Sequence, residues 1–151
     1  MQYYDAAKFH IFEASLLSMY YFAYASNLNQ KQMRERCPES QPKFTATLPN
    51  YKLVFVGWSR QWQGGVANLR HFRGERVHGA IYEVSDRDLR RLDSHEGYPR
   101  SANRLNVTTF NEDGEPIPAI TYIKAGQSEE TQPSPEYLAV IQQGYRDWRL
   151  V

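Results

Sequence analysis

Two alternating segments joined by a tight turn constrain the fold of this chain more than any other feature. Over residues 104–110, apolar or β-branched side chains alternate with polar ones, which is typical of a half-buried strand. An Asp113-Gly114 dipeptide follows, and residues 117–123 form a second apolar run. Because aspartate followed by glycine favours a hairpin turn, these residues predict an antiparallel β-hairpin.

Further strand-like runs precede the hairpin. They cover residues 19–24, 51–56, 66–72 and 77–84, and the last three are set off by Pro49-Asn50, Gly64-Gly65 and Gly74. Five to seven sequential strands with short helices between them predict an α+β domain, built on a small, mostly antiparallel β-barrel or a curled mixed sheet. The strand, helix and strand at the start leave a layered α/β arrangement as the alternative.

Three short helices are predicted beside the strands. The first follows the turn Ala25-Ser26-Asn27 and ends by Pro38. The second begins at Ser85, whose hydroxyl caps the helix while the acid of Asp88 reaches back, and it ends near Gly97.

The third helix begins at Ser134 as N-cap, with Pro135 at the first helical position. Its apolar side chains recur at steps of three and four residues, which predicts one buried stripe. The stripe consists of Leu138, Ile141, Tyr145 and Trp148.

Composition and charge exclude several function classes. The 151 residues carry 18 Lys and Arg against 17 Asp and Glu, a net charge of +1, with no long block of like charge. Neither a nucleic-acid nor a membrane partner is therefore expected. With 41% hydrophobic and 14% aromatic residues, the sequence predicts one folded domain over residues 19–151. The only cysteine, Cys37, permits no internal disulfide, which fits a cytoplasmic protein.

Residues 1–18 form a leader of their own. Phe9, Phe12 and Leu16 recur at helical spacing, and Met19 stands directly before the first strand-like run. The leader is either a docking helix or an extension of a chain that naturally starts at Met19. It lacks the basic and apolar regions of a secretory signal, and no later run is long enough to span a bilayer.

The turn from Tyr24 to Leu28 is the first candidate site. It joins a buried strand to the start of a helix, so successive backbone N–H groups point at one place with the helix dipole behind them. Such a turn can hold a carboxylate or an oxyanion. The alternative is that Ser26 and Asn27 only cap the helix.

Glu96 is the second candidate. It lies at the end of the second helix, where Gly97 turns the chain and Pro99 stiffens it. A carboxylate at the negative end of a helix dipole is electrostatically unfavourable, which singles Glu96 out from an ordinary surface acid.

Three other groupings carry weaker signals. His95 and Asp93 flank Glu96, but no second histidine follows at ligand spacing, so no metal is expected. A serine hydrolase built on Ser26 lacks the G-x-S-x-G pattern. An aromatic and glycine-rich stretch either walls a pocket or packs into the core and turns; it consists of Trp58, Trp62, Gly64 and Gly65.

Taken in order, several segments resemble the gamma-glutamylcyclotransferase-like (AIG2-like) family. They are Tyr21-Phe22-Ala23-Tyr24-Ala25-Ser26-Asn27-Leu28, Trp62 to Ala67, Val77 to Tyr82, Leu92 to Pro99, and Pro133 to Tyr137. The resemblance covers nearly everything from residue 20 onward. It implies the compact barrel of that family, with flanking helices.

The resemblance also implies an activity that needs no cofactor. The α-amine of a small γ-glutamyl substrate attacks its own γ-carbonyl, forms 5-oxoproline and expels an amine or amino acid. Glu96 is implied as the general acid/base. Substrate-binding positions are implied at Tyr21, Tyr24, Ala25, Ser26, Asn27, Leu28, Gly65 and Tyr137, in a monomer or a homodimer.

The chain departs from the family pattern twice. Ala25 replaces the usual glycine of the loop, which matters if that position needs a positive φ. Ser101-Ala102-Asn103 stands where relatives commonly carry an aromatic residue, so the resemblance implies a missing pocket wall here and a changed substrate preference. These departures keep two alternatives open: a catalytically silent module that binds a small ligand or a protein, and a hydrolase that releases glutamate.

Overall fold

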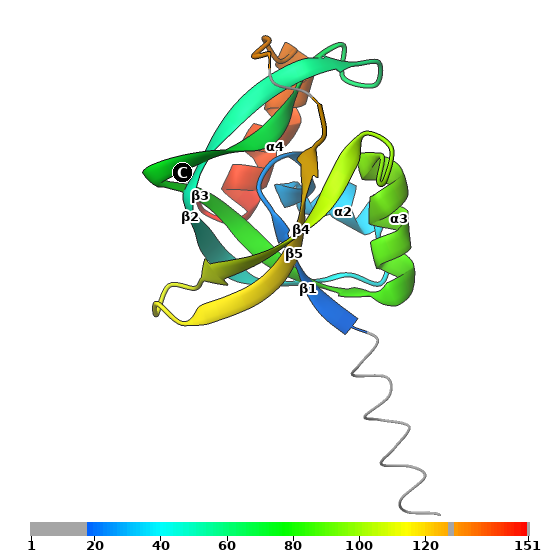
Figure 1. The fold of residues 1–151 in the computed structure, drawn as a ribbon. Helices are drawn as coiled ribbons and strands as arrows, with labels where there is room; N and C mark the ends of the chain where they lie inside the picture. The colour runs from blue at the N-terminus through cyan, green and yellow to red at the C-terminus, as the bar shows by residue number, and fades with distance from the viewer. Residues whose placement is uncertain (1–17, 127–128, 151) are drawn as a thin grey trace, which may run out of the picture.

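Five strands close into a barrel in the computed structural model, which describes residues 18–126 and 129–150 (Figure 1). Around the barrel the order is β1-β3-β2-β4-β5. The strands are β1 (Ser18–Ala23), β2 (Gln41–Ser59), β3 (Gly64–Ser85), β4 (Ala102–Phe110) and β5 (Pro116–Lys124). Only β1 and β5 pair in parallel.

The prediction of a mostly antiparallel barrel in an α+β fold is confirmed. Because β1 and β2 are not neighbours in the barrel, the layered α/β alternative is wrong. The hairpin is also confirmed, as β4 and β5 pair from Ala102–Lys124 to Phe110–Pro116. The prediction of a docking helix or extension falls on residues 1–17, outside the described residues, and Ser18 already belongs to β1.

Two expected strand breaks are wrong. Pro49-Asn50 lies inside β2 and Gly74 inside β3, so these two strands run long and bend instead of dividing. Pro49 pairs with Arg76 and Tyr51 with His71, which leaves Asn50 opposite residues 72–75. The Gly74 N–H donates to Asn50 Oδ1 at 3.1 Å, so the punctuating residues build a bulge within one continuous pair.

Both faces of β1 are buried, which explains its unbroken apolar sequence. Phe22 points into the barrel and packs in the same cluster as Leu48 and Leu69. Tyr21 and Ala23 face outward into a second cluster between the barrel and the helices. A strand that is covered on both sides lacks the alternation of a half-buried one.

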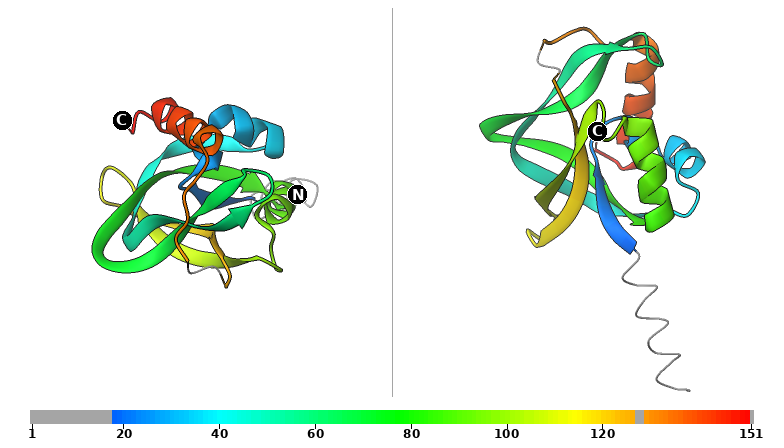
Figure 2. Two further views of the ribbon diagram at one scale, coloured as in Figure 1. Left: turned by 90° about the horizontal axis from the view of Figure 1, so that it is seen from above. Right: turned by 45° about the vertical axis from the view of Figure 1, so that its right-hand side comes forward.

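The helices cover the outside of the barrel. They are the 3-10 turn η1 (Ser26–Leu28), α2 (Gln30–Arg36), α3 (Asp86–Glu96) and α4 (Pro135–Asp147). Figure 2 shows α2 and α4 over the same side of the barrel. No helix in the described ranges is both long and apolar enough to cross a membrane.

The start of α4 is as predicted, but its buried stripe is shifted. Ser134 Oγ accepts from the Tyr137 N–H, and Pro135 opens the helix. The fully buried positions are Tyr137, Ile141 and Gly144. The expected Leu138, Tyr145 and Trp148 are only partly buried, because the face of α4 that packs against η1 is the one that carries Gly144.

That face makes a close contact at Gly144. A Cβ added there would lie 2.5 Å from the Asn29 nitrogen and 2.6 Å from Leu28 Cβ. Farther along α4, the Asp147 carboxylate accepts from the Gln30 N–H at 2.9 Å, and Trp148 Nε1 donates to the Leu28 carbonyl at 2.9 Å. Helix α4 therefore fixes the turn that follows β1.

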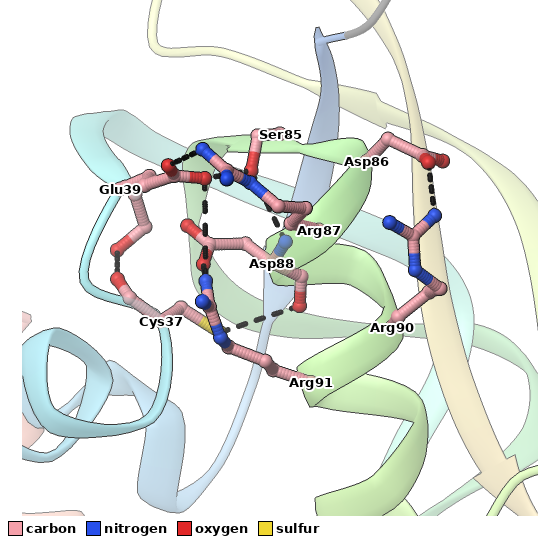
Figure 3. Close-up of polar contacts among 9 residues, drawn as sticks. Cys37, Glu39, Ser85, Asp86, Arg87, Asp88, Arg90 and Arg91 are labelled. Carbon is pink, nitrogen blue, oxygen red and sulfur yellow. Dashed lines mark hydrogen bonds and ion pairs between the residues drawn. The ribbon is translucent and has the colours of Figure 1, made fainter.

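The start of α3 is held by a network of charged groups (Figure 3). Ser85 Oγ accepts from the Asp88 N–H at 3.1 Å and donates to Glu39 at 2.6 Å, and Arg87 pairs with the same carboxylate. The Asp88 side chain does not reach back, so that half of the predicted capping box is wrong. It pairs with Arg91 at 2.6 Å instead, and its Oδ2 has no hydrogen-bond partner among residues 18–126 and 129–150.

Gly144→Ala tests the contact between α4 and the turn. Alanine in an exposed helix position stabilises by about 1 kcal/mol relative to glycine, whereas forced overpacking costs about 1–3 kcal/mol. Because the new Cβ meets backbone atoms, we expect a net loss and a lower Tm by a few degrees. Thermal unfolding followed by circular dichroism measures it, and a Tm above that of the wild type would contradict the close contact.

Glu39→Gln tests the network at α3. The hydrogen bond from Ser85 and the pairing with Arg87 lower the pKa of the Glu39 carboxyl. A lowered pKa stabilises the folded state at pH values above about 4.3, the unfolded value, and the contribution disappears as the pH falls through the folded value. We therefore expect the variant to be less stable at pH 7 and the difference to be smaller at about pH 3, because the contribution is lost as the pH falls through the lowered folded value. Urea unfolding at both pH values measures it; a difference that persists undiminished in acid would point to packing.

Candidate active site

A cavity of about 90 Å³ opens where the turn after β1, the end of α3 and the start of α4 meet. Most of the predicted site residues line it: Tyr21, Tyr24, Ala25, Ser26, Asn27, Glu96 and Tyr137. They come from sequence positions more than a hundred residues apart and meet because β1, β3 and β5 are neighbours in the barrel. Further lining residues are Arg36, Ser59, Gln61, Trp62, Val66, Ala67, His95, Tyr122 and Lys124.

The turn after β1 lines the cavity with Ala25, Ser26 and Asn27. Ser26 begins the 3-10 turn η1, and no side chain caps it. The first N–H groups of a helical turn have no acceptor within the turn. Ala25 has a φ of −139°, so the alanine that replaces the family glycine does not need a left-handed backbone.

Polar side chains fix the shape of that turn. Asn27 Nδ2 donates to the Tyr21 hydroxyl at 3.0 Å, and Asn27 Oδ1 accepts from Gln32 at 3.1 Å and from Arg36 at 3.2 Å. Gln32 also donates to Ser26 Oγ at 2.9 Å. The alternative in which Ser26 and Asn27 only cap the helix is wrong, because Asn29 caps α2 by accepting from the Gln32 N–H at 3.0 Å. Asn27 instead joins the turn to α2 and binds the Arg36 guanidinium beside the cavity.

Glu96 is the last residue of α3, and it lines the same cavity as the turn after β1. Gly97 follows in a left-handed conformation with φ +85°, which ends the helix as predicted. Lys124 at the end of β5 holds the glutamate, since its Nζ donates to the Glu96 carbonyl at 2.9 Å and lies 3.6 Å from Oε1. The Glu96 side chain keeps 20% of its surface exposed, so solvent and substrate can reach it.

Three tyrosines surround the carboxylate and stay protonated. Burial raises the pKa of Tyr21 and Tyr24, and the negative charge of Glu96 raises both further. Burial also raises the pKa of Tyr137 to about 12, against a smaller opposing effect of its hydrogen bond with Ala67. The Tyr24 hydroxyl already donates to the Tyr122 carbonyl at 2.7 Å, whereas the hydroxyls of Tyr21 and Tyr137 accept hydrogen bonds and can donate their protons into the cavity at neutral pH.

Tyr137 is positioned by two contacts. Its hydroxyl accepts from the Ala67 N–H at 2.9 Å, which leaves its own proton available. Its ring packs on Trp62 with centroids 4.7 Å apart, and the cavity is walled by both rings. Trp62 thus lines the pocket, whereas Trp58 on the same stretch is 68% exposed.

Two predicted site residues do not line this cavity. Leu28 is fully buried and packs against α4, where its carbonyl accepts from Trp148 Nε1. Gly65 is buried against Thr131, whose Oγ1 would lie 2.4 Å from an added Cβ. Its neighbours Val66 and Ala67 line the cavity instead, so the glycine serves close packing of the backbone.

Several lining residues were not singled out from the sequence. Tyr122 and Lys124 stand two apart on β5, so the strand period could have placed both on one face of the predicted hairpin. Arg36 carried no such signal, because only the fold of α2 against η1 brings it to Asn27. His95 also lines the cavity, and burial together with the charge of Arg36 lowers its pKa.

The weaker sequence signals form no second centre. Asp93 is bound elsewhere, since it accepts from the Tyr122 hydroxyl at 2.6 Å and from Arg104 Nε at 3.0 Å. Within residues 18–126 and 129–150, no three His, Cys, Asp or Glu side chains gather as metal ligands. Among the described residues, the hydrogen bond found at the Ser26 hydroxyl is one accepted from Gln32 at 2.9 Å, and not one donated to a histidine as a serine hydrolase requires.

The comparisons of this sequence with protein families and with individual proteins agree with each other. Residues 21–149 match the family described as "Gamma-glutamyl cyclotransferase, AIG2-like". The chain is 30% identical to the gamma-glutamylcyclotransferase of Bos taurus over 135 residues, which cover 86% of this chain and 71% of the relative. The human protein of the same name is 29% identical over the same shares.

Solved structures agree with the sequence comparison. An uncharacterized protein from Homo sapiens superposes with a TM-score of 0.85 at 29% identity, over 89% of this chain and 82% of that chain. A structure described as a gamma-glutamyl cyclotransferase superposes with a TM-score of 0.84 at 28% identity, over 88% and 81%. The match over residues 21–149 and this shared barrel establish that the chain belongs to the gamma-glutamyl cyclotransferase, AIG2-like family.

Proposed function

We propose that this chain converts a γ-glutamyl amide into 5-oxoproline and releases an amine or amino acid. One observation carries the proposal: Glu96 and the residues at the start of η1 line the same small cavity. Relatives named gamma-glutamylcyclotransferase support the reaction class. The reaction needs no cofactor.

The proposed chemistry is an intramolecular aminolysis. The α-nitrogen of the γ-glutamyl group bonds to its own γ-carbonyl carbon, and the bond from that carbon to the departing nitrogen breaks. Tethered and well-oriented groups react with effective molarities of about 10⁵ to 10⁸ M. The enzyme therefore has to fold the substrate, move protons from the attacking to the departing nitrogen and stabilise an oxyanion.

Glu96 is the proposed proton carrier. Its carboxylate accepts a proton from the α-ammonium, which frees the nucleophile, and returns the proton to the departing nitrogen. Lys124 supports this role because it holds the backbone and the side chain of Glu96 in place. A second proton leaves the α-nitrogen when it becomes the lactam amide, so both protons end on the departing nitrogen, which leaves as an ammonium group, and no further reagent is consumed.

The wall formed by the η1 turn is proposed to bind the acidic end of the substrate. Arg36 presents a guanidinium beside the η1 turn, where a substrate α-carboxylate can accept from it and from the backbone N–H groups. Tyr21 and Tyr137 can donate to the γ-carbonyl oxygen as it becomes an oxyanion, since their own protons are not used by the bonds from Asn27 and Ala67. A cytoplasmic location and a monomer or homodimer remain predictions.

Glu96→Gln is the first test. Removing a general acid/base lowers turnover by about 10²- to 10⁴-fold, so we expect 5-oxoproline release from a panel of γ-glutamyl amides to fall by that factor. Mass spectrometry of 5-oxoproline and glutamate measures it, with Glu75→Gln on the exposed β3 bulge as the control. Free glutamate in place of 5-oxoproline would indicate the hydrolase, and folded wild-type protein that releases neither would indicate the binding module.

Arg36→Gln tests the proposed carboxylate site. Hydrogen bonds to charged groups contribute about 1.5–3 kcal/mol, so we expect KM to rise by about 10- to 100-fold. The effect on kcat should be smaller, because Arg36 is proposed to bind the substrate carboxylate and takes no part in the proton transfer. Arg34→Gln, on the exposed side of the same helix, is the matched control, and an equal rise in both variants would argue against the assignment.

A further inference from the structure

A second hollow adjoins the candidate active site on the far side of Glu96. It has a volume of about 220 Å³ and includes Trp58, Ser94, Gly97 and Ser101. The two hollows adjoin each other, since five residues line both. These are Ser59, Val66, His95, Glu96 and Lys124.

The position of Trp58 results from a bulge in β2. Val56 pairs with Val66 and Ser59 with Gly64, so Gly57 and Trp58 together oppose Gly65 alone. Gly57 has a φ of +63°, the left-handed conformation of a bulge that begins with glycine. Such bulges re-aim a side chain, and here the extra residue turns an indole toward the hollow beside Glu96.

Trp58 is unusually exposed for a large aromatic side chain. It is 68% exposed, and the other exposed large hydrophobic side chain in the described ranges, Phe72, is 46% exposed. Phe72 lines neither hollow and lies beneath Lys52, whose Nζ is 4.6 Å from the ring centroid. Trp58 is thus the exposed ring that stands beside the proposed proton carrier.

We propose that the second hollow receives the departing amine of the substrate and that Trp58 selects amines with an apolar group. This inference rests on the proposed cyclisation. The bond that breaks joins the γ-carbonyl carbon to the nitrogen that Glu96 protonates, so the two halves of the substrate lie on either side of this carboxylate. With the γ-glutamyl half in the first cavity, the departing half lies in the hollow that shares Glu96.

The chemistry of that hollow favours a flat or aliphatic group. The Trp58 indole offers an apolar face that an alkyl or aromatic substituent covers when it binds. Lys124, the cation of this wall, already pairs with Glu96 at 3.6 Å, and Ser101 Oγ donates to the Gly97 carbonyl at 3.3 Å. The indole is therefore the feature of this hollow that distinguishes one departing amine from another.

The test compares two substrates with the same γ-glutamyl half. We expect Trp58→Ala to lower the ratio of kcat/KM for γ-glutamyl 2-phenylethylamide to that for γ-glutamyl methylamide by about 10-fold, and Trp58→Phe to retain most of it. Release of 5-oxoproline gives both values. Comparing each variant with the wild type cancels the difference in basicity between the two departing amines.

Phe72→Ala is the matched control, since it removes an exposed ring that lines neither hollow. It should keep the wild-type ratio, and thermal unfolding checks that all variants are folded. An unchanged ratio in Trp58→Ala, or an equal loss on both amides, would overturn the assignment of the hollow while leaving the cyclisation in place. A wild-type protein that releases no 5-oxoproline from either amide overturns the proposed function, and the assignment with it.

Discussion

The contact between α4 and the turn after β1 is the constraint on which the rest of the site depends. Gly144 allows the helix to approach the backbone of Leu28 and Asn29, and Asp147 and Trp148 bind the same turn by hydrogen bonds. The first residues of that helix carry Tyr137 into the cavity, so one helix fixes a wall and the turn that faces it. A looser contact would move both together.

The charge arrangement follows from this scaffold. Glu96 shares its cavity with two cations that come from different elements, Lys124 on β5 and Arg36 on α2, and with three buried tyrosines that remain neutral. The cavity therefore offers an acceptor for a proton, cations for a carboxylate, and neutral hydroxyls for an oxygen that becomes negative. This combination suits a small zwitterionic substrate that reacts with itself.

Much of the fold was predictable because its signals are local. The hairpin turn at Gly114, the caps at Ser85 and Ser134, and the helix end at Gly97 each depend on residues a few positions apart. The continuity of β2 and β3 was not, because Asn50 and Gly74 make a bulge only when their strands are paired.

In the candidate site, too, the residues with local sequence signals were predictable and those placed by the fold were not. The turn and Glu96 stand in recognisable local patterns, whereas Arg36 reaches the cavity through Asn27, and Leu28 and Gly65 pack elsewhere.

The parallel pairing of β1 with β5 affects how the molecule folds. Thr121 binds the Phe22 carbonyl across 99 residues, so the ring of strands cannot close early. Contacts of such sequence separation slow folding. During synthesis the cavity is therefore assembled last, when nearly the whole chain is available.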